Sequence, residues 1–575
     1  MTAHRGEGAR AASLALAAVL LAQVAIGAHY VARTGLVDRA SGARVFVLWD
    51  DAMISMRYAR NLAAGDGLVW NPGGEAVQGY TNLGLTLAMA GVHALGARPE
   101  TASLWIQLLA LAALVATSAL AARRATDLAR RASGPRDAAA SETSPRARGG
   151  EEWAGVGAAL ALLVCAPHQI FALQGADTIF VATCLFVAAA SFARARRLGA
   201  IAVGALAAAV LVRPDATLFA LAAAAVAAWT AAPGARGRAA APTLAAIAAL
   251  WIALVAFGLA YYGDPLPNTY YLKATGSPLA KVLASGVDQL LAFGWRWLPA
   301  LALAAWAVWS AVREPAPPGA PATAHTHARA HPEAVLLAAF VALATAYHVQ
   351  VGGDWVRDYG SRYLVQVLPA VAVLAAAGAF RAAARAPAAV RAAFAVAAPV
   401  LAFAAGGPPA AMHEWTTPSA PTLFHAENQG NFERARFLQR ATRGDTLVAA
   451  HWAGIGPYFA ERPSVDVLGR ADRHIAHLEV DRFIPGHSKW DWDYVLDVVR
   501  PDLIDFGSRG LRDHPSFRRD YAALVVGPQA VLFVRRESLP KILDPTLLVV
   551  PLADLLPPLE DEPGDGGDAG DGAAG

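Results

Sequence analysis

Residues 12–31, "ASLALAAVLLAQVAIGAHYV", form an apolar run of the length that an α-helix needs to cross a bilayer. The run is longer than the core of a signal peptide and lacks a clear cleavage signal, so we expect a retained helix. Similar runs recur to about residue 405. The chain is 56% hydrophobic and 16% charged, whereas soluble chains carry about a quarter charged residues. The sequence therefore predicts a polytopic α-helical membrane protein.

The apolar runs predict about eleven spans, and the arginines between them predict the orientation. The expected spans are residues 12–31, 101–122, 153–168, 178–193, 198–212, 216–231, 243–262, 295–312, 333–350, 363–380 and 392–406. Short loops rich in Lys and Arg stay in the cytoplasm, and loop 123–152 has seven arginines and no lysine. Counting the short apolar segment 82–97 as a span would place that loop outside. We therefore interpret 82–97 as an interfacial or re-entrant helix.

This topology places the loops that are rich in polar residues on the extracytoplasmic face. It also divides the chain into three parts. Residues 1–406 form the membrane domain, with a first outer loop at 32–100. Residues 407–556 have the composition of a soluble domain, and their alternating pattern predicts a small extracytoplasmic α/β domain. Its expected strands are 445–450, 464–469, 502–507, 522–527 and 530–536, and its expected helices 431–441 and 493–500. The acidic, Gly-rich tail 557–575 is expected to be disordered.

The first outer loop begins with two adjacent carboxylates in "FVLWDDAMISMRYAR", residues 46–60. Asp50 and Asp51 stand where a membrane helix meets water, and either could simply cap the helix that follows. Two carboxylates near a bilayer are costly unless something pairs with them or uses them. Arg57 and Arg60 are the partners that the local sequence offers.

Several blocks, in order along the chain, resemble GT-C membrane glycosyltransferases, in particular the terminal arabinofuranosyltransferase family of actinobacterial cell walls and its bacterial relatives. The most specific is "DDAMISMRYARNLAAGDGLVWNPGGEAVQGYTN" (50–82). The others are "QGADT" (174–178), "LVRPD" (211–215), "YYGDPLPNTYYLKA" (261–274), "VGGDWVRDYGSRYLVQVLP" (351–369), "VDVLGRADRHIA" (465–476) and "PGHSKWDWDYVL" (485–496). Asp177 stands where that group usually has Glu. The resemblance covers about residues 45–500 and implies a GT-C-like membrane fold.

The resemblance implies an inverting glycosyltransferase in the bacterial inner (cytoplasmic) membrane, with its active site on the periplasmic or extracellular side. The implied donor is a polyprenyl-phosphate-linked sugar, arabinofuranose among the candidates. The implied acceptor is an extracytoplasmic glycan, lipid or protein, and no nucleic acid is expected. The alternative is a non-catalytic transporter or flippase of lipid-linked cell-envelope precursors. Transporters carry charged residues inside their spans and often internal repeats, whereas here the acidic groups collect at one face.

Transfer from a sugar phosphate to an alcohol needs a base for the hydroxyl proton and cations for the departing phosphate. We expect Asp50 to be the base and Asp51 to orient the acceptor or share a metal, with the order of the two left open. The expected phosphate-binding residues are Lys273, Arg357 and Arg362, although each could be an interface anchor instead. The expected substrate-binding residues are Arg57, Tyr58, Asn82, Asp177, Asp264, Asp354 and Trp490.

Some of these residues have simpler interpretations. Arg213 and Asp215 could form a local ion pair, and Asp264 in "GDPLPN" could serve a turn. Trp490 could pack domains together rather than stack on a glycan. No cofactor is certain: paired aspartates suit a divalent ion such as Mg, Mn or Ca, but the His, Asp and Trp of the soluble domain fit no compact ligand pattern. Cys165 and Cys184 lie in apolar runs, where small core residues are expected.

Overall fold

The computed structural model describes residues 2–132, 150–195, 197–313, 331–356, 359–506, 509–526 and 531–555. Arg357 and the predicted tail 557–575 lie outside this part of the chain. The fold divides into two compact units, of which the first contains residues 1–436, 452–460 and 468–490 and the second contains 437–451, 461–467 and 491–575. The units thus depart from a division at residue 406, because three segments beyond it, 407–436, 452–460 and 468–490, belong to the first unit.

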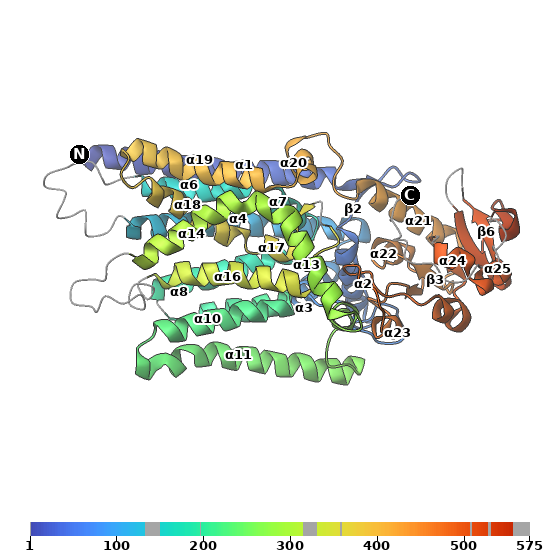
Figure 1. Cartoon of the computed structure of the whole chain (residues 1–575). Coiled ribbons are helices and arrows are strands. Elements are labelled where there is room, and N and C mark those ends of the chain that lie inside the picture. The colour runs from blue at the N-terminus through green and yellow to red at the C-terminus, as the bar shows by residue number, and fades with distance from the viewer. Residues whose placement is uncertain are drawn as a thin grey trace. The chain divides into compact units, whose positions relative to one another are not determined.

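Long helices form most of the first unit (Figure 1). They are α1 (Thr2–Arg33), α4 (Pro99–Ala132), α6 (Glu151–Val164), α7 (Ala166–Leu173), α8 (Thr178–Ala195), α9 (Ala200–Val212), α10 (Thr217–Thr230), α11 (Arg236–Phe257), α14 (Leu298–Arg313), α16 (Pro332–Gln350), α18 (Leu368–Ala382) and α19 (Ala388–Gly406). The connections α10–α11 and α18–α19 lie at the same end of the bundle as the N-terminus (Figure 1).

Each of the eleven predicted spans corresponds to helical structure. Within the described residues, seven helices are long and apolar enough to cross a membrane, and α6 with α7, bent by 61°, makes an eighth if the pair is one span. The other three predictions fall on shorter apolar helices, at Ala200–Val212, Pro214–Thr230 and Leu368–Ala382. Polytopic membrane architecture is therefore confirmed. The three shorter helices have fewer than the ~20 residues that a helix needs to cross a bilayer by itself.

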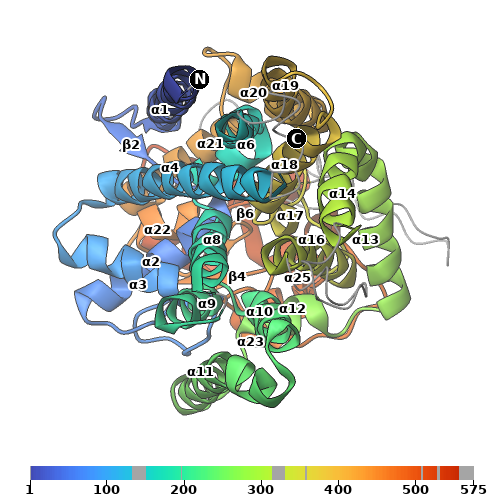
Figure 2. The ribbon, with the colours of Figure 1, turned by 90° about the vertical axis from the view of Figure 1, so that its left-hand side faces the viewer.

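Helix α18 is the centre of the bundle. Viewed along the helices it lies among α4, α6, α14, α16 and α19 (Figure 2), and residues 368–381 are all buried. Its Ala- and Gly-rich sequence, "LPAVAVLAAAGAFRA", lets neighbouring backbones approach closely, as small residues do in membrane helix packing. A Cβ on Gly378 would lie 1.9 Å from the carbonyl oxygen of Leu303 in α14. Helix α11 lies at the edge, with only Thr243 and Ile247 buried.

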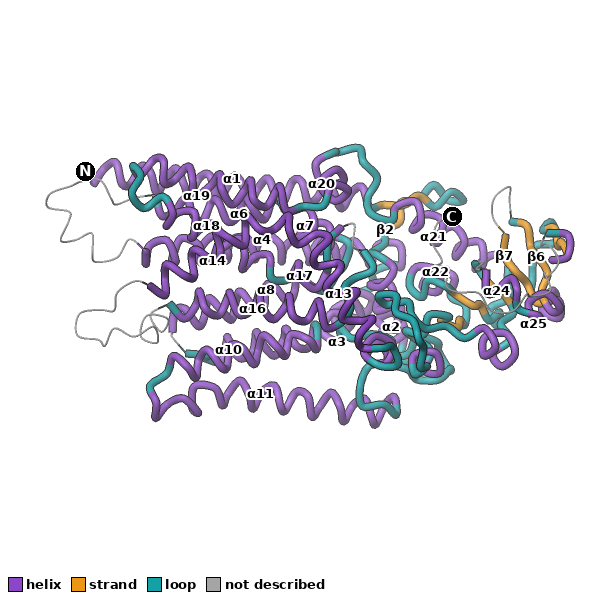
Figure 3. Tube along the Cα trace, in the orientation of Figure 1, coloured by secondary structure: helices purple, strands orange, loops and turns teal. Residues whose placement is uncertain are grey.

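Shorter elements gather with most of the loops at the opposite end of the bundle from the N-terminus (Figure 3). They are β1 (Gly35–Val37), β2 (Arg44–Phe46), α2 (Asp50–Ala64), α3 (Leu83–Ala94), η3 (Gly258–Tyr262), α12 (Asn268–Ala274), α13 (Leu279–Gly294), α17 (Arg362–Val365), α20 (Pro409–Thr416), α22 (Ile455–Ala460) and α23 (Arg473–Ala476). Helix α3 lies in the segment predicted to be interfacial or re-entrant, and its 12 residues are too few to cross a bilayer. These elements carry the candidate site.

A six-stranded mixed sheet organises the second unit. Its order is β4 (Ser464–Asp466), β3 (Val448–Ala450), β5 (Leu503–Ile504), β7 (Val531–Arg535), β6 (Tyr521–Val525) and β8 (Leu548–Pro551). The pairs β3–β4 and β3–β5 are parallel and the others antiparallel. The helices are α24 (Arg509–Asp513), α25 (Pro515–Asp520), the π-helix η6 (Tyr494–Val499) and the end of α21 (His425–Ala441). All five predicted strands are present, and β8 is an addition.

Candidate functional site

Asp50 is held by backbone amides of a segment far away in the sequence. It is the first residue of α2, and both its oxygens accept hydrogen bonds, Oδ2 from the N–H of Gly454 at 3.1 Å and Oδ1 from that of Ile455 at 2.8 Å. These amides stand at the start of α22, where N–H groups have no partner inside the helix. Asp50 thus caps a second helix rather than the one that it begins.

This contact requires a glycine at position 454. A Cβ there would lie 2.0 Å from the carbonyl oxygen of Asp50 and 2.8 Å from its Cγ. Ala453 next to it accepts a hydrogen bond from the indole of Trp70 at 3.2 Å. Segment 452–460 therefore packs directly on the first outer loop and fixes Asp50.

Asp51 lies in an ion-pair chain with arginines from two other segments. Arg362 Nη1 donates to Asp51 Oδ2 at 2.7 Å, and Arg470 Nη2 lies 3.2 Å from Oδ1. The Arg362 Nε and Nη2 donate to Asp354, at 3.1 Å and 2.8 Å from Oδ1, and its guanidinium stands 4.4 Å from the centre of the Trp49 ring. A fork-shaped contact of this kind fixes both partners. The chain is therefore a rigid platform beside Asp50.

Two cation donors in this cluster remain available to a ligand. Arg470 Nη1 is buried and has no hydrogen-bond partner in the described residues, although Asn268 Nδ2 holds the Arg470 backbone by donating to its carbonyl at 3.1 Å. Lys273 makes no hydrogen bond or ion pair within the described chain, yet the charges of Asp51, Arg362 and Arg470 all act on it. A buried donor without a partner costs free energy. The arrangement is suited to an anion.

The two neighbouring aspartates have opposite acidities. Burial raises the pKa of Asp50 to about 7; the N–H of Ile455 opposes this rise and the negative charge of Asp51 adds to it. Burial would also raise the pKa of Asp51, but Arg470, Arg362 and Lys273 together bring it far below its usual value. Burial and the charge of Arg362 lower the pKa of Lys273 to about 8. Asp50 can therefore exchange a proton near neutral pH, while Asp51 stays ionised.

The structure brings together five of the predicted site residues, Asp50, Asp51, Lys273, Asp354 and Arg362. Three others, Arg57, Tyr58 and Asn82, lie within the first outer loop and form hydrogen bonds to other residues of that loop. Arg57 donates to the carbonyl of Trp70 at 2.6 Å, and Tyr58 donates to that of Val77 at 2.6 Å. Asn82 accepts from Ser55 at 2.7 Å. Arg60, expected to balance the acidic pair, donates to the carbonyl of Tyr458 at 2.8 Å.

The remaining predicted residues lie in separate pairs. Asp177 accepts from Arg213 at 2.9 Å, and Arg213 also donates to Asp215 through Nε and Nη2, so that expected local ion pair is present. Asp264 lies 3.3 Å from Arg473. Trp490 is stacked under Arg482, whose Cζ lies 3.4 Å from the ring centre, so one face of this indole is already covered.

The aspartate pair does not fit a divalent ion as it stands. All four oxygens already face N–H donors, and two arginines and a lysine surround Asp51. Calcium and magnesium require six or more oxygen ligands. In the second unit, Asp493, Asp497 and His514 have ligand atoms within 4.8 Å of one another. There His514 Nδ1 accepts from the N–H of Ser516, so the neutral ring carries its proton on Nε2, which faces Asp493 at 2.9 Å. That nitrogen has no lone pair for a metal.

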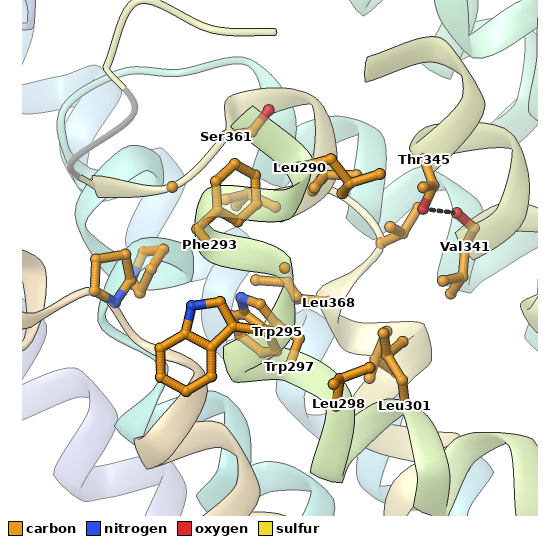
Figure 4. Close-up of a pocket in the computed structure, with 18 of the residues that line it drawn as sticks. Leu290, Phe293, Trp295, Trp297, Leu298, Leu301, Val341, Thr345, Ser361 and Leu368 are labelled. Carbon is orange, nitrogen blue, oxygen red and sulfur yellow. Dashed lines mark hydrogen bonds between the residues drawn. The ribbon is translucent and has the colours of Figure 1, made fainter. Parts of the chain in front are cut away.

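An apolar cavity of about 370 Å³ has Ser361, the residue before Arg362, in its wall. Its walls come from α13, α14, α16, α17 and α18, and Figure 4 shows Phe293, Trp295 and Trp297 gathered along it. The two hydroxyl groups in the wall are occupied: Thr345 Oγ1 donates to the carbonyl of Val341 at 2.9 Å, and Ser361 Oγ lies 2.8 Å from His348 Nδ1. Ser361, which lines the cavity, directly precedes Arg362. The cavity suits an apolar chain whose polar end reaches the cations.

Comparison with solved structures identifies the architecture. The structure of ArnT from Cupriavidus metallidurans in the apo state superposes with a TM-score of 0.51 at 13% identity, covering 89% of this chain and 97% of that chain. The oligosaccharyltransferase AglB from Archaeoglobus fulgidus, in complex with an inhibitory peptide and a dolichol-phosphate, gives a TM-score of 0.51 at 12% identity and covers 93% and 75%. Both are GT-C glycosyltransferases. The chain has the GT-C fold.

At these identities the likeness concerns the fold alone, because one fold hosts many activities. A family described as a domain of unknown function (DUF8728) matches residues 421–537 of the chain. Among curated proteins, none matches the sequence.

Sequence reasoning missed Arg470, Gly454 and Ile455 as parts of this site. Arg470 lies in the block "VDVLGRADRHIA", which the resemblance had already marked, but the block does not tell which carboxylate the arginine meets. Gly454 and Ile455 act through their backbone amides, which no side-chain pattern reveals.

Proposed function

We propose that the chain is an inverting glycosyltransferase that moves a sugar from a polyprenyl phosphate to an acceptor hydroxyl. The observation that carries this proposal is that Ser361 lines an apolar cavity while the next residue, Arg362, belongs to the cluster of cations and carboxylates. A lipid-linked sugar phosphate has the same two parts, an apolar chain and an anionic head. The GT-C fold, shared with an oligosaccharyltransferase whose structure holds a dolichol-phosphate, supports this donor class.

The charges of the cluster favour the head group of such a donor. Lys273, Arg362 and Arg470 carry three positive charges, against the two ionised carboxylates of Asp51 and Asp354. Counted without Asp50, whose oxygens are held by backbone amides, the cluster has an excess of one positive charge, which the phosphodiester of the donor neutralises. Lys273 and Arg470 Nη1 are the donors left for it, and Asp51 and Asp354 keep Arg362 in place.

Asp50 performs the proton transfer in this proposal. The acceptor hydroxyl gives its proton to the Asp50 carboxylate as its oxygen bonds to the anomeric carbon. The bond from that carbon to the phosphate oxygen breaks at the same time, and its electron pair leaves with the phosphate. Lys273 and Arg470 stabilise the negative charge that develops there. Attack from the face opposite the phosphate inverts the anomeric centre.

The resemblance to the terminal arabinofuranosyltransferases makes arabinofuranose one candidate for the transferred sugar. The same resemblance and the arginine distribution support a reaction on the extracytoplasmic side of the cytoplasmic membrane, with a glycan, lipid or protein acceptor.

The test is sugar transfer by purified protein in liposomes that contain lipid-linked sugar, comparing wild type with Asp50→Asn and Asp51→Asn. Loss of a general base lowers rates by about 10²–10⁴-fold, so Asp50→Asn should reduce kcat by that amount. Asp51→Asn should mainly raise KM for the donor, because Arg362 and Arg470 lose their shared partner. Asp66→Asn, an exposed carboxylate of the same loop, is the matched control and should transfer at the wild-type rate.

Two results would contradict the proposal. Wild-type transfer rates in both Asp50→Asn and Asp51→Asn would remove the base assignment. Movement of labelled lipid across the bilayer without any transfer would favour the transporter or flippase instead.

A further inference from the structure

Three aromatic rings form a group next to the carboxylate and cation cluster. The rings of Trp355 and His487 have centroids 4.6 Å apart, and those of Trp452 and His487 are 5.8 Å apart at an interplanar angle of 80°. Trp355 is 38% exposed, although it directly follows the buried Asp354. A large apolar ring therefore faces outward at the edge of a charged site.

Each ring is connected to a group that takes part in the proposed reaction. His487 Nε2 lies 3.5 Å from Arg470 Nη2, and Arg470 is the partner of Asp51. Trp452 belongs to the segment whose next residues, Gly454 and Ile455, hold Asp50. The ring group is thus linked to Asp51 through the Arg470 side chain and to Asp50 through the backbone of the segment that contains Trp452.

The ring group is fixed in orientation by its surroundings. His487 Nδ1 lies 3.0 Å from the carbonyl of Pro485, an acceptor only, so Nδ1 carries a proton and the neutral ring has its lone pair on Nε2. The backbone N–H of Asp354 donates to Gln289 Oε1 at 2.8 Å, and the Asp354 side chain is held by Arg362. Trp355 therefore stands on a firmly held backbone. Trp490, by contrast, already has one face covered by Arg482.

We propose that Trp355, with His487 and Trp452 behind it, is the subsite for the ring of the sugar that is transferred. This inference rests on the proposed glycosyltransferase function and specifies how that site recognises its donor. A sugar ring presents C–H groups on its faces and hydroxyls at its edge. The exposed indole face takes the C–H groups, while the polar cluster beside it offers hydrogen bonds to the hydroxyls, as sites for small ligands combine aromatic walls with few polar groups.

The donor ring is favoured over an acceptor ring because of where the group lies. The transferred sugar must span from the phosphate, at Lys273 and Arg470, to the base, Asp50. The ring group is linked to both ends of this span. His487 lies against Arg470 at the phosphate end, and Trp452 belongs to the segment that holds Asp50 at the other. An acceptor needs only its hydroxyl near Asp50.

The experiment measures binding to purified protein in nanodiscs by three probes: polyprenyl phosphate without sugar, and the same lipid carrying arabinofuranose or glucose. Trp355→Ala should bind the bare lipid phosphate as wild type does and lose about 10- to 100-fold in affinity for the sugar-bearing probe that wild type prefers. Trp355→Phe should recover part of that loss. Trp105→Ala, a 57% exposed tryptophan on α4, is the matched control and should change neither affinity.

The outcomes separate this inference from the function on which it rests. If wild type binds none of the probes and transfers no sugar, the proposed function fails, and the subsite fails with it. If wild type binds bare and sugar-bearing lipid equally, or if Trp355→Ala weakens all probes alike, the subsite is refuted while the lipid-phosphate site stands. If Trp355→Ala raises only the KM for the acceptor in transfer assays, the rings bind the acceptor, and the donor assignment is wrong.

Discussion

Asp50 and Asp51 show how two identical neighbours acquire different chemistry from their surroundings. Backbone amides hold Asp50, and these are neutral donors that offset burial only in part. Asp51 faces two guanidinium groups, whose charges hold its pKa far below the usual value, so that it is ionised at neutral pH. A group with a pKa near neutrality makes an effective proton acceptor, whereas one with a very low pKa does not. The pair therefore divides into a base and a fixed anion that organises the cations.

The pH dependence of kcat/KM for the donor should have two limbs. Below about pH 7 Asp50 binds a proton and can no longer accept one, so activity falls as the pH falls. Above about pH 8 Lys273 loses its charge and phosphate binding weakens, so activity falls as the pH rises. Lys273→Arg, which keeps its charge at all these pH values, should remove the alkaline limb and leave the acidic one.

The variant Asp51→Asn tests whether the fall in activity at low pH comes from Asp50. Asp51 contributes to the raised pKa of Asp50, and without it Arg470 acts on Asp50 unopposed. The acidic limb of the residual activity should therefore move to lower pH. An acidic limb that stays in place in Asp51→Asn, together with an alkaline limb that survives in Lys273→Arg, would assign the titrations to other groups.

The elements differ in how far the sequence could predict them. The long spans were predictable because each is a continuous apolar run, and bilayer thickness sets its length. The stretch between the expected spans 243–262 and 295–312 was not among the predicted helices, yet it contains α12 and α13. Helix α13 is amphipathic, and its exposed side repeats every fourth residue, at Leu279, Leu283, Val287 and Leu291, so no continuous run reveals it. A search for helical periodicity would have found it.

Helix α13 matters because it and α14 form one side of the apolar cavity, where Leu301 stands at 37% exposure. Leu301→Trp should fill part of the cavity without disturbing buried packing. Displacing two or three methylene groups of a bound chain costs about 2 kcal/mol, at about 0.8 kcal/mol each. KM for a long-chain polyprenyl donor should then rise by about 30-fold.

Chain length and position provide the controls for this change. A donor shortened to two isoprene units, measured with the same variant, should lose little, because its chain does not reach Leu301. Ile252→Trp, at a 70% exposed position on α11, should leave both donors unchanged. An equal loss for short and long donors would show that the variant disturbs the head-group site rather than the cavity.

At the scale of the whole molecule, the predicted fold class is confirmed, while the composition of the site was only partly predictable. The acidic pair, Lys273 and Arg362 were visible in outer loops. The amides that hold Asp50 were not, since Gly454 lies 404 residues away from Asp50 in the sequence. Such a contact depends on packing between distant segments, which no local pattern in a single sequence reveals.

The orientation of the chain in the membrane is the remaining prediction at this scale. Arginines in the α18–α19 connection predict a cytoplasmic position for it, and the first outer loop belongs on the other side.

After replacement of Cys165 and Cys184 by Ala, single cysteines can report each side of the membrane. They are Asp66→Cys in the outer loop, Ala384→Cys between α18 and α19, and Thr546→Cys in the second unit, all at exposed positions. A membrane-impermeant maleimide applied to intact bacterial cells should label Asp66→Cys and Thr546→Cys, and should label Ala384→Cys only after permeabilisation. Labelling of Ala384→Cys alone in intact cells would reverse the topology, and the aspartates would then face the cytoplasm, where an extracytoplasmic acceptor is out of reach.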